Sequence, residues 1–203
     1  MSKDPNFIVD LLEGVKSNQI SIDEAKAQLS HYDELGFAKI DLHRAKRQGF
    51  PEVIFGEGKT KEQINQIIES LTHHDNVILV TRIDETKAKF VLEHHPYLQY
   101  HSVANIVSTP IEEIKKSQNY ISILCAGTSD LAVAEEAALT AEVMGIQVKR
   151  FYDVGVSGIH RLFNHIHVIR QGKVSVVIAG MEGALASVVG GPVSYTHLTL
   201  PTS

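Results

Sequence analysis

Three glycine-containing segments in the second half of the chain hold the residues best suited to chemistry. They cover residues 127–130, 153–160 and 180–183, and each follows an apolar run and precedes a helical pattern. In an open parallel sheet, ligands bind beyond the carboxyl ends of the strands, which is where such segments lie. The three segments therefore predict one ligand site, formed where three strands end.

The first segment, Gly127-Thr128-Ser129-Asp130, joins a glycine to two hydroxyls and a carboxylate. At the start of a helix, backbone amides and hydroxyls can hold a phosphate or a ribose. The Asp130 carboxylate would instead suit sugar hydroxyls or a metal. Ser, Thr and Asp also cap helices in proteins of every function, so capping alone stays open as a second interpretation.

The second segment contains Gly155, Ser157 and Gly158, which allow close approach of the backbone to a ligand. An ordinary turn is the alternative interpretation. His160 and Arg161 begin the next predicted helix, where the helix dipole disfavours cations. This conflict indicates an anion or a cofactor nearby.

Two further reactive side chains follow predicted buried strands. Glu182 in the third segment is either a cap of the next helix or, when partly buried, a general acid or base. Cys125 is interpreted as a small apolar core residue rather than a nucleophile. Because Cys125 is the one cysteine of the chain, an internal disulfide and a four-thiolate zinc site are excluded.

Basic side chains surround the glycine turns of the first half. Arg44, Arg47 and Lys59 form either a solvated basic face or a second anion site, such as one for a diphosphate. The paired histidines at residues 73–74 and 94–95 lack metal-ligand spacing, so we expect no metal site. Neither a Gly-x-Gly-x-x-Gly pattern nor a Walker loop is present. These residues alone indicate a protein that binds or transforms a phosphorylated small molecule.

The elements that must position these residues are clearest after residue 116. Strands are predicted at residues 121–126, 147–152 and 174–179, and helices at residues 131–144, 159–170 and 184–189. This alternation is typical of a doubly wound parallel sheet.

The first half predicts a helical arm followed by a small α/β unit. Helices are predicted at residues 6–15, 60–71 and 84–93, a helix-opening capping box at residues 21–24, and strands at residues 37–42, 52–56, 76–81 and within 97–107. Residues 109–119 are polar and are interpreted as a link. We therefore predict two domains, at residues 1–115 and 116–203.

Charge and hydropathy exclude two classes of partner. Lys and Arg number 19 against 24 Asp and Glu, giving a net charge of −5, so we expect no nucleic-acid partner. No apolar stretch approaches the roughly 18 residues that span a bilayer. The N-terminus, at residues 1–5, has no basic region that leads into an apolar one, so we expect no signal peptide. We expect a cytoplasmic protein without a membrane partner.

Longer motifs resemble one family. Residues 42–60 (LHRAKRQGFPEVIFGEGKT) look like the N-terminal signature of LarB-type proteins. Residues 126–130 (AGTSD), 153–162 (DVGVSGIHRL) and 179–191 (AGMEGALASVVGG) are similar to the C-terminal half of that family. The resemblance implies a small N-terminal α/β domain followed by a PurE-like, flavodoxin-like three-layer domain with a doubly wound parallel sheet.

The resemblance also implies an activity, that of pyridinium-3,5-biscarboxylic acid mononucleotide synthase. This carboxylase and hydrolase converts nicotinic acid adenine dinucleotide, CO2 and water to that mononucleotide and AMP. The reaction begins synthesis of the nickel-pincer nucleotide cofactor of lactate racemase. CO2 is then a co-substrate, Mg2+ is a plausible aid to diphosphate cleavage, and no cofactor is bound covalently. PurE-like proteins form homo-octamers, so a homo-oligomer is expected.

The family's roles carry over to single positions. Ser129 and Asp130 match its Ser-Asp motif and would hold the ribose phosphate, with Asp130 also in the catalytic set. Glu182 would move the ring proton, and His160 would position a carboxylate. The family's nucleophilic cysteine adds to the pyridinium ring, which makes a ring carbon able to attack CO2. Cys125 is not at the matching position.

In the family that cysteine lies beyond the last residue of this chain. We therefore expect a C-terminally incomplete domain that holds most of the substrate site without its nucleophile, and we interpret residues 192–203 as artefactual. Two alternatives stay open. One is a PurE-like carboxyaminoimidazole ribonucleotide mutase, which the extra N-terminal domain disfavours. The other is a non-catalytic nucleotide-binding fragment.

Overall fold

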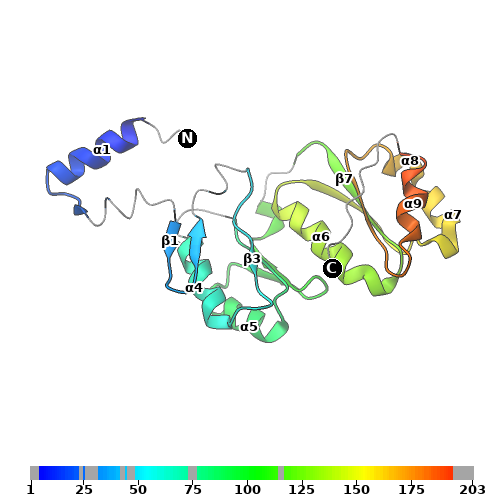
Figure 1. Cartoon of the computed structure of the whole chain (residues 1–203), viewed down its shortest axis with the longest axis horizontal. Helices are drawn as coiled ribbons and strands as arrows, with labels where there is room; N and C mark the ends of the chain where they lie inside the picture. Colours follow the sequence, from blue (N-terminus) through cyan, green and yellow to red (C-terminus); the bar gives the residue numbers. More distant parts are fainter. Residues whose placement is uncertain are drawn as a thin grey trace.

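The chain forms two α/β halves that lie side by side (Figure 1). The computed structural model describes residues 5–22, 25, 32–41, 44, 49–72, 77–113 and 117–193. No helix in these ranges combines the length and the apolar composition that crossing a bilayer would need. The predicted α/β class is confirmed, and the two halves are described in turn.

The first half is built on a mixed sheet with the strand order β3-β4-β6-β5 over the described residues. Strand β3 pairs parallel to β4, whereas β4 and β5 both pair antiparallel to β6. The elements of this half are α1 (Pro5–Lys16), β1 (Tyr32–Glu34), β2 (Lys39–Asp41), β3 (Ile54–Phe55), α4 (Lys61–Thr72), β4 (Leu79–Thr81), α5 (Glu85–His94), β5 (Gln99–His101), β6 (Ile106–Ser108) and the 3-10 helix η1 (Ile111–Glu113).

Helix α4 illustrates how the sequence pattern sets the packing. Its apolar residues recur at positions 64, 67, 68 and 71, one face of a helix, and this face is buried in the core of the first half. The predicted capping pair is confirmed, because the Thr60 N–H donates to Gln63 Oε1 (3.0 Å) and the Gln63 N–H donates to Thr60 Oγ1 (3.2 Å). This pair sets the start of α4, after residues 56–60, which connect it to β3.

The start of the strand predicted at residues 37–42 is wrong. The structure has a hairpin, in which β1 pairs antiparallel with β2 and Tyr32 lies opposite Asp41. Gly36, with φ of +80°, and the Leu35 N–H bond to Ala38 O (2.9 Å) make the turn, so residues 37 and 38 leave the strand. The predicted capping box lies partly outside the described residues, because residues 23, 24 and 26–31 are not among them.

The second half is the predicted doubly wound unit. Its described strands form a parallel sheet in the order β8-β7-β9, with β7 in the centre. The elements are β7 (Tyr120–Cys125), the 3-10 helix η2 (Thr128–Asp130), α6 (Leu131–Val143), β8 (Gln147–Phe151), the 3-10 helix η3 (Val156–Gly158), α7 (Ile159–Phe163), α8 (Ile166–Ile169), β9 (Ser175–Ile178) and α9 (Ala184–Gly190).

Alternation along β7 sends side chains to the two faces of this sheet. Ile123 and Cys125 pack against Ala134 and Ala138 of helix α6. Leu124 lies on the opposite face, in a cluster that residues of α7, α8 and α9 complete. Helices therefore cover both faces (Figure 1), and the predicted three-layer arrangement is confirmed.

One long helix predicted at residues 159–170 is instead two short ones, α7 and α8. The break follows a tight turn in which the His165 N–H donates to Leu162 O (3.0 Å). The break accompanies full burial of both Leu162 and Ile169 and places the His165 ring 5.5 Å from the Phe151 ring. Leu162 and Ile169 are seven residues apart and would share a face of a continuous helix as well, so their burial does not by itself account for the break.

Helix α6 joins the two halves. Leu139 and Val143 on one side of the helix pack with Leu79 of β4 and Ile106 of β6, in a cluster that also includes Ile111. Within the segment at residues 109–119 that was interpreted as a polar link, Ile111 is buried in this cluster, and the link itself stays a prediction. The predicted boundary at residue 115 and most of the tail predicted to be artefactual lie outside the described residues, so both stay predictions.

The stability of the first half should depend on pH through His95. His95 is 7% exposed, and its Nε2 has no hydrogen-bond partner within the described residues. Burial lowers the pKa of the imidazole, although the Glu69 carboxylate opposes this shift. As the pH falls below about 6.5, the unfolded chain takes up this proton before the folded chain does. We therefore expect the free energy of unfolding to fall between about pH 7.5 and pH 5.5.

The matched test compares His95→Phe with His167→Phe, at an exposed position. Urea unfolding at both pH values should show a weaker pH dependence in the first variant and the wild-type dependence in the second. Equal pH dependence in all three proteins would contradict the assignment.

Candidate functional site

The three glycine-containing segments converge on one cavity of about 220 Å³. It lies at the carboxyl ends of the parallel strands, because residues following β7, β8 and β9 all contribute to its wall. Six of the residues predicted for the site line this cavity: Gly127, Ser129, Asp130, Gly155, Ser157 and Glu182. The structure therefore brings these six residues together at one cavity, and their roles there stay predictions.

Backbone hydrogen bonds hold the three segments against one another. The Ala126 N–H donates to Ile178 O (3.0 Å), which continues the pairing of β7 with β9. On the other side, the Val154 and Gly155 N–H groups donate to the carbonyls of Cys125 and Ala126, each at 3.0 Å. The wall of the cavity is thus an extension of the sheet rather than a set of independent loops.

Asp130 occupies a central position in this wall. Its Oδ2 accepts a hydrogen bond from the Gly127 N–H (3.3 Å), and no side-chain capping bond is formed at the N-terminus of α6. A Cβ atom on Gly180 would lie 3.3 Å from Asp130 Oδ1, so the carboxylate also reaches the third segment. The carboxylate therefore caps the 3-10 helix η2, as the capping interpretation expected, and its second oxygen faces the third segment.

Polar groups of several kinds face this cavity. The hydroxyls of Ser129 and Ser157 are exposed, as are the hydroxyl of Thr128 beside the cavity and the carboxylate of Glu182. Thr128 and Ser129 open η2, where the first N–H groups of a helical turn have no acceptor within the turn. The site can therefore offer donors to a phosphate or a sugar.

Charge at this cavity is negative. The charged residues in its described lining are Asp130 and Glu182, and no Lys or Arg is among them. A phosphate bound here would depend on N–H and hydroxyl donors. Within the described ranges, no three His, Cys, Asp or Glu side chains are grouped to hold a metal ion. Mg2+ commonly binds through one or two carboxylates together with substrate phosphates, so the Mg2+ that the family resemblance makes plausible stays a prediction.

Five other predicted residues that the structure describes do not line the cavity, and one of them, Thr128, lies beside it as described above. Arg44 pairs with Glu52 (3.3 Å), and Lys59 Nζ donates to Phe55 O (3.2 Å), both in the first half. His160 is exposed on α7, and Gly158 is buried beside the Arg161 side chain. Arg47 lies outside the described residues.

Arg161, the cation at the start of α7, has an anionic partner within its own segment. Arg161 forms an ion pair with Asp153, whose backbone has φ of +57°. Its guanidinium lies so close to Gly158 that a Cβ there would come within 2.6 Å of it. Asp153 of the same segment thus supplies a negative charge to Arg161, and the expectation of an anion or a cofactor near His160 and Arg161 stays a prediction.

Cys125 is where the sequence placed it, in the core. It is 1% exposed, and its Sγ lies 3.0 Å from Gly127 O, to which the thiol donates. Burial raises the pKa of this thiol, and the nearby Asp130 carboxylate adds to the shift. A thiol that is buried and protonated is a poor nucleophile.

Gly180 and Met181 lie in the predicted third segment and line the cavity, although the sequence analysis named only Glu182 of that segment as a site residue. Met181 has φ of +55° and a fully exposed side chain at the cavity. The signal was weak, since an exposed methionine next to a glycine has no distinctive chemistry. Only the left-handed backbone marks it as unusual.

The close contact between the first two segments gives a testable expectation. A Cβ on Gly155 would lie 2.7 Å from the Ala126 carbonyl oxygen, a backbone atom that cannot move without disturbing β7. We expect Gly155→Ala to lower the free energy of unfolding by about 1–3 kcal/mol. Gly58→Ala is the control, because nothing lies within 4 Å of a Cβ there. Equal urea midpoints for the two variants would show that the contact is not required.

Comparison with known proteins places the chain in a family. The family model for the LarB/PurE-like N-terminal domain matches residues 32–111. An uncharacterized protein of Methanocaldococcus jannaschii is 36% identical over 206 residues, which cover 96% of this chain and 80% of the relative. The domain match agrees with the N-terminal signature identified above, and the relative extends the similarity over both halves. The chain therefore belongs to the LarB/PurE-like family.

Proposed function

We propose that this chain binds nicotinic acid adenine dinucleotide at the three-segment cavity, as the substrate-holding part of a carboxylase and hydrolase. The products would be pyridinium-3,5-biscarboxylic acid mononucleotide and AMP. Membership of the LarB/PurE-like family supports an enzyme in general. The observation that carries the proposal is the convergence of the Ser-Asp, Gly-Val-Ser-Gly and Met-Glu-Gly motifs on one cavity at the carboxyl ends of parallel strands.

The cavity suits the nicotinate mononucleotide half of this substrate. The N–H groups of η2 and the hydroxyls of Ser129 and Ser157 would hold the phosphate. Asp130, held by the Gly127 N–H, would accept hydrogen bonds from the ribose hydroxyls. The nicotinate ring carries one positive nitrogen and one carboxylate, so the charge of the wall does not select it. The proposed contacts to the phosphate and to the ribose therefore carry the binding of the mononucleotide half.

Carboxylation replaces one ring C–H bond by a C–C bond to CO2, and the hydrogen leaves as a proton. We propose Glu182, in the cavity wall, as the base that takes it. His160, exposed on α7, would position a carboxylate from the rim, as the family motif implies. Hydrolysis of the diphosphate adds water across one P–O bond and releases AMP. No step of this proposal uses a metal ion.

Binding of the dinucleotide should depend on the charge of Asp130. Asp130→Asn keeps the shape of the side chain but removes a charged acceptor, so we expect affinity to fall about tenfold or more. Isothermal titration calorimetry measures this directly. Asp10→Asn, at an exposed position on α1, is the matched control and should bind as the wild type does. Tighter binding of an aminoimidazole ribonucleotide than of the dinucleotide would favour a PurE-like mutase instead.

Turnover by this chain is a separate question. Because Cys125 is buried and its pKa is raised, we expect the 203-residue chain to form no dicarboxylated mononucleotide from the dinucleotide and CO2. Mass spectrometry of the reaction mixture is the measurement. Product that disappears in Cys125→Ala would show that this thiol reacts after all.

A further inference from the structure

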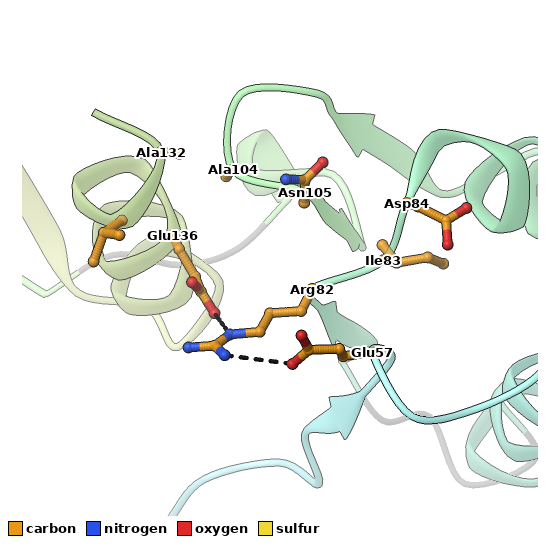
Figure 2. Close-up of a pocket in the computed structure, with 9 residues that line it drawn as sticks. Glu57, Arg82, Ile83, Asp84, Ala104, Asn105, Ala132 and Glu136 are labelled. Atoms are coloured by element: carbon orange, nitrogen blue, oxygen red, sulfur yellow. Dashed lines mark hydrogen bonds and ion pairs between the residues drawn. The ribbon is translucent and has the colours of Figure 1, made fainter. Parts of the chain in front are cut away.

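Helix α6 borders two cavities, so its placement affects the walls of both. Asp130, at its N-terminus, lines the three-segment cavity. A second cavity, of about 360 Å³, lies between the two halves of the chain, and Ala132 and Glu136 of α6 form part of its wall (Figure 2). There Arg82 lies between two carboxylates, with Nη1 3.5 Å from Glu57 Oε2 and Nε 3.5 Å from Glu136 Oε1. Glu136 thus ties one side of α6 to the first half of the chain.

The neighbouring residue, Glu135, reaches strand β8 instead. Its Oε1 accepts hydrogen bonds from Arg150 Nε (3.3 Å) and from the Tyr152 hydroxyl (2.7 Å). Arg150 also donates two hydrogen bonds, of 2.7 and 2.8 Å, to Glu142, which lies two helical turns further along α6. These four side chains, Glu135, Glu142, Arg150 and Tyr152, form what we call the α6–β8 network.

The charges of the α6–β8 network give the tyrosine a defined task. Two carboxylates face one guanidinium, and the side chains of Glu135 and Glu142 are only 20% and 12% exposed. A carboxylate in such surroundings needs hydrogen-bond donors, because water reaches it poorly. Burial and the hydrogen bond to Glu135 raise the pKa of Tyr152, so the phenol stays protonated and keeps donating. Tyr152 therefore supplies a donor that the single guanidinium does not.

Tyr152 also lies directly before the second of the three segments. The next residue, Asp153, has φ of +57°, a left-handed conformation that non-glycine residues adopt rarely. The Asp153 carboxylate pairs with Arg161, and the N–H groups of Val154 and Gly155 donate to carbonyls at the end of β7. Tyr152 thus holds the chain to α6 at the point where β8 gives way to the wall of the cavity.

One hydrogen bond therefore connects the first two segments by way of α6. Glu135 comes five residues after Asp130, a rise of about 7.5 Å along the helix. Alternation along β8 places Arg150 and Tyr152 on the face of the sheet that α6 covers, and the Tyr152 ring packs there against the cluster that contains Ala134. This connection is separate from the backbone hydrogen bonds between the segments.

We propose that Tyr152 and Glu135 are positioning residues of the three-segment cavity. The proposal rests on the function proposed above, and neither residue is in the described lining of the cavity. Their hydrogen bond sets the spacing between the first and second segments. It therefore sets the distance between the Asp130 carboxylate and the Ser157 hydroxyl, which would hold the ribose and the phosphate. Small misplacements of such groups weaken binding strongly.

Two Tyr→Phe variants of the full chain separate positioning from stability. Tyr152→Phe removes the network hydroxyl. Tyr120→Phe is the matched control, because its half-buried hydroxyl also donates to one acceptor, Val168 O (2.6 Å), but from the first residue of β7, the end away from the cavity. Urea midpoints should fall by similar amounts in both. Calorimetry with nicotinic acid mononucleotide should show about threefold to tenfold weaker binding in Tyr152→Phe and binding within about twofold of wild type in Tyr120→Phe.

Variants of Glu135 test the other partner of the hydrogen bond. Glu135→Ala removes the acceptor and should weaken mononucleotide binding as Tyr152→Phe does. Combining the two substitutions should weaken it no further than the weaker-binding single variant, because both remove the same bond. Glu135→Gln keeps an oxygen that accepts from the Tyr152 hydroxyl, so its affinity should return to within about twofold of wild type. A role limited to stability would change urea midpoints without this pattern in affinity.

Hydrogen exchange of the ligand-free chain gives a readout that does not depend on the substrate. The Val154 and Gly155 amides should exchange about threefold or more faster in Tyr152→Phe than in wild type, and at the wild-type rate in Tyr120→Phe. Equal mononucleotide affinity in wild type and Tyr152→Phe, or equal weakening in both tyrosine variants, overturns the positioning role while the proposed function stands. If wild type binds no mononucleotide, the proposed function fails. Wild-type exchange rates in Tyr152→Phe would then overturn the ordering of the segment as well, whereas faster exchange would support it.

Discussion

Helix α6 is buried on two sides, and both halves of the protein depend on this packing. Ala134 and Ala138 allow the helix to lie close to the central strand β7, while Leu139 and Val143 fill the space against β4 and β6. Arg150 of β8 adds a two-pronged ion pair to Glu142 at the far end of the helix, at 2.7 and 2.8 Å. Because the same helix begins at Asp130, the packing that joins the halves also fixes one wall of each cavity.

The two cavities share a physical design. In both, the wall is formed at the carboxyl ends of parallel strands, where backbone groups are held by the sheet rather than by loops. Non-glycine residues with left-handed backbone also occur there: Asp153 and Met181 near the first cavity, and Arg82 and Asn105 at the second. Conformations of this kind cost free energy and persist where the surrounding structure enforces them, which is common at functional sites.

The electrostatics of the site explain why its glycines matter. Acidic residues line both cavities, so a nucleotide cannot be held by charge pairing alone, and donors must come from the backbone and from hydroxyls. Backbone N–H groups and short hydroxyl side chains lie close to the main chain, so the main chain must approach the ligand closely for them to donate hydrogen bonds to it. Gly155, packed against Ala126, and Gly180, facing Asp130, are the positions where a side chain would prevent that approach.

The sequence by itself determined the class of fold, the three motif segments and the buried state of Cys125, because alternation, helix capping and glycine placement are local signals. The sequence could not determine which of the predicted site residues lie close together in space. Asp130 and Glu182 come together because β7 and β9 are neighbours, whereas Arg44 and Lys59 belong to the other sheet. It also missed the burial of Ile111 and the break in the helix predicted at residues 159–170, which the local pattern does not reveal. The cavity between the halves was invisible to it, since Glu57 and Glu136 meet Arg82 only through the tertiary packing of α6.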